Sequence, residues 1–154
     1  MTESTKFAST QVYYTLLGFK EMLKLDPSKK TISEAKKRIS KLLRGYEELK
    51  GAEYISEEAL KICKVENPYG INYSGRKKTG CYYEHSTPIR VLRDYLLNEE
   101  LDAIEVAEYL AENSTVTWIT PEENDLLNKA GYNNKRPGGW RKCYEEVGIK
   151  IVQK

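Results

Sequence analysis

The segment TISEAKKRISKLLRGYEELKG, residues 31–51, predicts an amphipathic helix and with it a largely helical fold. It opens with a capping box, in which the Thr31 hydroxyl and the Glu34 carboxylate satisfy free backbone donors, and Gly51 ends it. We interpret its lysine-rich face as solvated surface, with a binding surface as the alternative. The apolar stripe opposite comprises Ile32, Ala35, Ile39, Leu42, Leu43, Tyr46 and Leu49, and the lysines are Lys36, Lys37, Lys41 and Lys50.

A second helix is predicted upstream of this segment. It starts at Ser9-Thr10 and ends at Asp26-Pro27, because a residue before proline is disfavoured in helical conformation. The apolar positions that recur at helical spacing are Val12, Leu16, Phe19 and Leu23. Two helices joined by so short a connection predict an antiparallel hairpin, followed by a shorter helix over residues 56–63.

Residues 64–80, KVENPYGINYSGRKKTG, read as a long loop because proline, glycine, asparagine and serine are frequent there. Loops of this length inside compact domains are commonly functional or mobile. The loop ends in a basic tip, Arg76-Lys77-Lys78, just upstream of the only histidine of the chain, His85.

The remainder of the chain mixes short strands with helices. Its strand candidates are Cys81-Tyr82-Tyr83, residues 115–119 (TVTWI) and an edge strand in residues 149–152 (IKIV). Its helix candidates begin at Thr87-Pro88, at the capping box of Asp102 and Glu105, and at Thr120-Pro121, and a last one covers residues 141–147.

These elements predict an α+β fold that is predominantly helical. The length of 154 residues suits one domain, in which a helical half (1–63) packs on an α+β half (64–154). The first half would contribute the helical hairpin, and the second a short sheet of two or three strands.

The composition excludes several classes of protein. Three cysteines, an odd number far apart, form neither a disulfide framework nor a zinc pattern, and we expect a reducing, cytoplasmic setting. No apolar run reaches membrane-spanning length, and no signal peptide is visible, so no membrane partner is expected. Nucleotide-binding glycine motifs are missing, which predicts no nucleotide cofactor. A net charge of +2 neither requires nor excludes a nucleic-acid partner.

Histidine is the side chain best suited to proton transfer near neutral pH, which draws attention to His85 in GCYYEHSTPIRVL, residues 80–92. The segment EHSTP, residues 84–88, resembles the first motif of the HNH, or His-Me finger, nucleases. That motif has an acidic residue, the base histidine, two variable residues and a proline.

The resemblance implies a finger of two strands and a helix around one divalent metal ion. Its elements would be CYYEH, TVTWI and the helix at PEENDLLNK. It implies that His85 activates water as the general base, that Glu84 is a metal ligand, and that Asn124 or Asn128 occupies the later helix position. The oxygen ligands would suit magnesium or manganese.

A structural role for these residues is the alternative. His85 would then cap the following helix, hydrogen-bond a backbone carbonyl, or bind a ligand without catalysis, and Glu84 would be an ordinary exposed carboxylate. In PEEND, residues 121–125, acidic residues at a helix start are explained by the helix dipole alone.

A second basic cluster lies in residues 133–144, NNKRPGGWRKCY. Cationic groups neutralise phosphates and aromatic rings stack on unpaired bases, so this cluster and the basic tip predict one positive surface for nucleic acid. The alternative is that Trp140 packs on the core while the cations stay solvated. The candidate nucleic-acid contacts are Arg76, Lys77, Lys78, Lys135, Arg136, Trp140 and Arg141.

Two functions of different classes remain open. The first is a small nucleic-acid-interacting protein, a divergent metal-dependent endonuclease in which His85 is the general base. The second is a non-enzymatic regulator or inhibitor from a phage or mobile element, whose partner is DNA, RNA or another protein.

Overall fold

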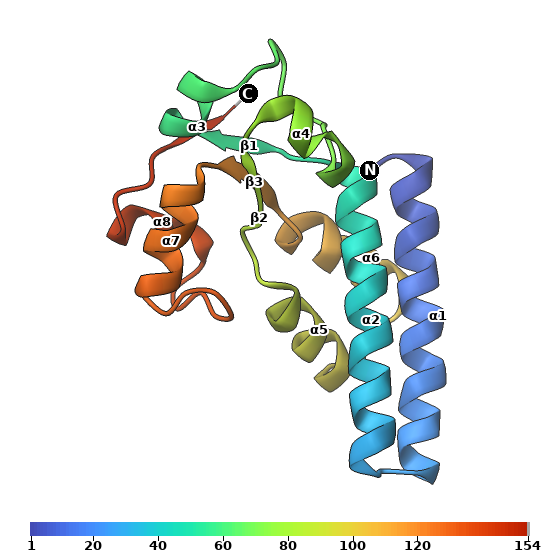
Figure 1. The fold of residues 1–154 in the computed structure, drawn as a ribbon. Helices are drawn as coiled ribbons and strands as arrows, with labels where there is room; N and C mark the ends of the chain where they lie inside the picture. Colours follow the sequence, from blue (N-terminus) through green and yellow to red (C-terminus); the bar gives the residue numbers. More distant parts are fainter. Residues whose placement is uncertain (154) are drawn as a thin grey trace.

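The computed structural model describes residues 1–153 and begins with the predicted helical hairpin. Helices α1 (Glu3–Leu25) and α2 (Lys29–Lys50) lie side by side and antiparallel (Figure 1). Thr2 caps α1 and Ser28 caps α2, each by accepting a hydrogen bond from the backbone N–H three residues on.

Both hairpin helices start earlier than the sequence predicted. The start expected at Ser9-Thr10 is wrong because Thr2 already supplies a cap and residues 3–8 continue the helix. The cap expected at Thr31 is also wrong, since the Thr31 N–H donates to the Ser28 hydroxyl, 3.3 Å away. For α2, the sequence therefore indicated a cap but placed it three residues too late.

Helices α5 (Ile89–Asn98) and α6 (Ala103–Asn113) pack on the hairpin. The capping box predicted at the start of α6 is present, with Asp102 and Glu105 as its two members. Apolar side chains of all four helices form one core cluster, which includes Val12, Leu16, Ile39, Leu43, Tyr46, Leu92, Leu96 and Leu110. The helical core therefore draws on both halves of the chain.

A four-stranded mixed sheet, in the order β2-β3-β1-β4, lies beside this core. Its strands are β1 (Tyr54–Ser56), β2 (Tyr82–His85), β3 (Val116–Ile119) and β4 (Ile151–Gln153). Strand β3 pairs antiparallel with β2 and parallel with β1, and β4 is the predicted edge strand. The sequence did not predict β1, so the sheet has one strand more than expected.

The remaining elements cover the sheet. They are α3 (Glu57–Ile62), η1 (Tyr73–Gly75), α4 (Arg76–Thr79), α7 (Pro121–Lys129) and α8 (Trp140–Glu146). Residues 64–80 were expected to be a loop throughout, and η1 and α4 correct that expectation. The chain before η1 packs closely on the end of α2: a Cβ added at Gly51, whose φ is +71°, would lie 2.4 Å from the Gly70 carbonyl oxygen.

The division of the chain at residue 63 does not describe the packing. Helices α5 and α6 are inserted between the paired strands β2 and β3, yet they join the hairpin core (Figure 1). Strand β1, from the first half, lies inside the sheet. The predominantly helical α+β class is nevertheless confirmed. None of the helices within residues 1–153 combines the length and the apolar character that crossing a bilayer requires.

Candidate functional site

His85 is the last residue of β2, where it pairs with Val116 of β3, and its ring reaches α2. Its Nδ1 contacts the Glu47 carboxylate, which is completely buried, and the other carboxylate oxygen accepts a hydrogen bond from the Ser114 hydroxyl at 3.0 Å. The Glu47–His85 pair leaves Nε2 as the ring nitrogen available to a ligand. His85 therefore does not cap α5, which has no side-chain cap.

Glu47 was not predicted, although the sequence contains a signal for it. The residue follows Leu43 by four positions on the face of α2 that is otherwise apolar. A carboxylate on such a face is rarely buried without a partner. The partner is His85, 38 residues away, and no local pattern identifies it.

The surroundings of His85 raise its pKa above the ordinary 6.5. Burial lowers this pKa, but the hydrogen bond and negative charge of Glu47, helped by Glu84, outweigh burial and the repulsion from Arg44. His85 therefore stays protonated to a higher pH than a free histidine. In its protonated form His85 carries a positive charge and an acidic proton at Nε2. Glu47 holds the ring, an arrangement used by acid–base catalysts.

A pH titration of the ring protons by NMR tests this interpretation directly, because the chain has one histidine. We expect a pKa above 6.5 in the native protein and a lower pKa in Glu47→Gln, where only Glu84 still opposes the effect of burial. Since the folded-state pKa is the raised one, the pair stabilises fully below about pH 6.5, and this stabilisation fades as pH rises through the folded-state pKa. A wild-type pKa below 6.5 would contradict the assignment.

Glu84, the other predicted catalytic residue, is not an exposed carboxylate. Its side chain is 13% exposed, and Oε1 accepts a hydrogen bond from Arg136, 2.5 Å away, whose side chain is 3% exposed. Burial raises the pKa of Glu84, while the charges of Arg136 and His85 act in the opposite direction. The burial of Arg136 makes it the partner of Glu84 rather than the phosphate contact that we expected.

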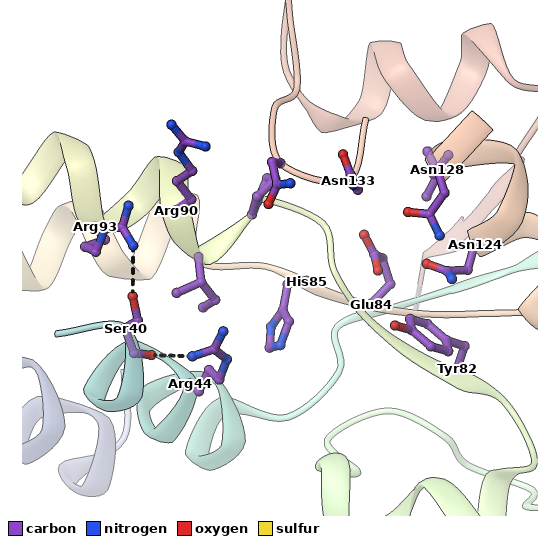
Figure 2. A pocket seen from close by; sticks show the side chains of 14 residues that line it. Ser40, Arg44, Tyr82, Glu84, His85, Arg90, Arg93, Asn124, Asn128 and Asn133 are labelled. Atoms are coloured by element: carbon purple, nitrogen blue, oxygen red, sulfur yellow. Dashed lines mark hydrogen bonds between the residues drawn. The ribbon is translucent and has the colours of Figure 1, made fainter. Parts of the chain in front are cut away.

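One pocket of about 390 Å³ brings the predicted site residues together. Figure 2 shows Glu84 beside Asn124 and Asn128 of α7, and His85 next to Arg44 of α2. The lining comprises Ser40, Arg44, Tyr82, Glu84, His85, Pro88, Ile89, Arg90, Arg93, Asn124, Leu127, Asn128, Asn133 and Asn134. His85 and α7, remote in sequence, therefore share one cavity.

Three arginines in this lining were not among the predicted contacts. Arg44 comes from the α2 face interpreted as solvated, and Arg90 and Arg93 come from α5. Asp94 forms ion pairs with Arg93 at 2.6 Å and with Arg90 at 3.5 Å, while Arg44 reaches the Ser40 carbonyl oxygen at 3.4 Å. The pocket thus combines cationic groups and amides, which suit an anionic ligand.

None of the predicted nucleic-acid contacts lines this pocket, although Arg136 pairs with Glu84, which does. The Arg76 guanidinium stacks on the Tyr73 ring at 3.9 Å, and Lys77 and Lys78 are exposed beside it. The Arg141 guanidinium covers the Trp140 ring at 4.4 Å and donates to the Tyr54 hydroxyl. Trp140 is half-buried, so the alternative that it packs on the core is closer to what the structure shows.

The oxygen donors at the pocket fit a divalent metal ion poorly. Glu84 supplies the one carboxylate of the predicted ligand set, and Arg136 already neutralises it. Asn124 and Asn128 add neutral amides only. None of the acidic residues at the helix start, residues 121–125, lines the pocket, and Glu123 closes the capping box of α7 and accepts from Ser56 at 2.6 Å. Within residues 1–153, no three His, Cys, Asp or Glu side chains form a metal-binding group.

Strands β2 and β3, which pair antiparallel, are separated in the chain by α5 and α6, and helix α7 follows β3. The same strands also belong to a wider sheet with β1 and β4. No protein-family model matches the chain, and no curated protein or solved structure matches it.

Proposed function

We propose that the chain binds nucleic acid and holds a backbone phosphate in the pocket beside His85. The observation that carries this proposal is the convergence of Arg44, Arg90 and His85, whose pKa is raised, on one cavity. Guanidinium and imidazolium groups donate charge-assisted hydrogen bonds to phosphate oxygens. Four asparagines in the same lining add neutral donors that tolerate any base sequence.

The basic residues extend beyond this pocket. A shallow depression beside it is lined by Lys29, Lys36 and Lys37 of α2 and shares Arg93 with it. On the other side, a third depression shares Arg44 and His85 and reaches Tyr73. Cationic groups thus continue from the pocket along α2, and an aromatic ring adjoins His85, as a polymer with repeated phosphates would require.

The test is oligonucleotide binding measured by fluorescence anisotropy over a series of salt concentrations. We expect Arg44→Gln combined with Arg90→Gln to weaken binding uniformly across sequences and to reduce the slope of log K against log salt by about 2, roughly 1 per lost phosphate contact. Arg38→Gln is the matched control, because Arg38 lies on the same helix but outside the pocket, paired with Glu34. Equal losses in the two variants would contradict the proposal.

Cleavage of the bound strand is the second part of the proposal, and the Glu47–His85 pair supports it. A buried carboxylate that holds an imidazole while its Nε2 stays available is typical of proton-transfer sites. The non-enzymatic alternative, a regulator or inhibitor, predicts salt-dependent binding of an intact strand, or, for a protein partner, no salt-dependent oligonucleotide binding. Adding magnesium or manganese tests for a metal-dependent nuclease, because such a nuclease would cleave the strand only when the ion is present.

A further inference from the structure

We propose that the substrate is RNA and that the pocket cleaves it without a metal ion, by attack of the ribose 2′-hydroxyl on the adjacent phosphorus. This inference rests on the nucleic-acid binding proposed above and specifies its substrate. Its geometric basis is that two ionisable groups of opposite charge, the Glu84 carboxylate and the His85 imidazolium, line one cavity together with Arg44 and Arg90.

The choice of the 2′-hydroxyl as nucleophile follows from the poor set of metal ligands in the pocket. Hydrolysis of a phosphodiester by water generally relies on metal ions to activate the water and to neutralise the phosphate. The pocket offers one carboxylate, already paired with Arg136, and neutral amides. RNA avoids the need to activate water because its 2′-hydroxyl lies next to the phosphorus within the same molecule, which gives a high effective concentration. DNA lacks this group.

The environments of Glu84 and His85 favour opposite protonation states. Arg136 beside Glu84 favours the ionised carboxylate that a base needs, and burial raises the pKa of that carboxyl above its usual value, which strengthens it as a base. Glu47 raises the pKa of His85, which favours the protonated form that an acid needs. Environments that keep two neighbouring groups in opposite protonation states are typical of acid–base pairs.

In the proposed reaction, Glu84 takes the proton of the 2′-hydroxyl while O2′ forms a bond to phosphorus. The bond from phosphorus to O5′ breaks, and Nε2 of His85 gives its proton to the leaving O5′. The products are a 2′,3′-cyclic phosphate and a 5′-hydroxyl, and one proton is taken up for each one released. Arg44 and Arg90 stabilise the charge that develops on the non-bridging oxygens. Solvent exchange then returns a proton from Glu84 to His85.

The experiment compares single-stranded RNA with DNA of the same sequence, both in excess EDTA and in magnesium. We expect cleavage of RNA in EDTA, intact DNA in both conditions, and products that carry the mass of a cyclic phosphate. His85→Ala and Glu84→Gln should each slow cleavage at least about 100-fold, the usual contribution of a positioned acid or base. Glu84→Gln keeps an oxygen for Arg136, so its fold is protected where alanine would orphan a buried cation.

Binding of the same RNA, measured in parallel, distinguishes the two proposals. If RNA binds with the expected salt dependence but stays intact in EDTA, the cleavage mechanism is wrong while the proposed binding stands. If no RNA or DNA binds, both are wrong. Cleavage that requires magnesium, cleavage of DNA, or an unchanged rate in both variants would each overturn the metal-free mechanism.

Discussion

Replacing Glu47 by alanine is expected to lower the free energy of unfolding by about 3 kcal/mol, the lower end of the range for breaking a buried ion pair. The carboxylate is completely buried and serves two partners, the His85 Nδ1 and the Ser114 hydroxyl. Its removal leaves both without an acceptor. The loss stays at the lower end because His85, 31% exposed, can release its proton.

Urea denaturation at pH 6 measures this effect, since His85 is protonated there and the pair contributes fully. The matched control is Glu34→Ala on the same helix. Glu34 pairs with Arg38 at the surface, so its removal should change the free energy of unfolding by about 0.5 kcal/mol or less. A Glu47→Ala protein as stable as this control would show that the buried pair does not hold α2 to β2.

Replacing Trp118 by alanine is expected to destabilise the fold by about 3–5 kcal/mol, as for other fully buried aromatic residues. Trp118, in β3, has no exposed surface, its ring meets the edge of Tyr83 with centroids 4.9 Å apart, and its Nε1 donates to the Pro68 carbonyl oxygen at 3.0 Å. The substitution leaves a cavity next to the sheet and a carbonyl without its donor.

The measurement is again urea denaturation, and Trp140 remains as the fluorescence reporter in the variant. The comparison variant is Trp140→Ala, and its unfolding is monitored by the fluorescence of Trp118. Trp140 packs against Tyr54 and Tyr144 but is only half-buried, so its loss should cost less. If the Trp140 substitution is the more damaging of the two, the sheet core is not centred on Trp118.

The elements that the sequence predicted well have their determinants close together in the chain. The capping boxes of α6 and α7 involve residues three positions apart, and strand β3 is a continuous apolar and β-branched run. Strand β1 has only three residues, Tyr54–Ser56, and its conformation depends on pairing with β3 and β4. Such a segment carries no periodic signal of its own, which is why it was missed.

The same contrast between local and distant determinants applies to the residues around the pocket. His85, Glu84, Asn124 and Asn128 were identified from local motifs, and one pocket does contain them. Glu47, Arg44 and Arg90 were not predicted, because a core-facing side and a solvated side were enough to explain the sequences of their helices. Glu47 reaches His85, and Arg44 and Arg90 reach the pocket, because α2 and α5 pack around the end of β2, which is a property of the tertiary structure.

The insertion of α5 and α6 between β2 and β3 has a consequence for the kinetics of folding. The hairpin of α1 and α2 needs only contacts between neighbouring segments, whereas Tyr54 must find Thr117 to align β1 with β3. Contacts between distant segments carry a larger loop-closure cost and slow the search. We therefore expect a transition state with an ordered helical hairpin and an unformed sheet, so that φ-values are high in α2 and low in β1 and β4.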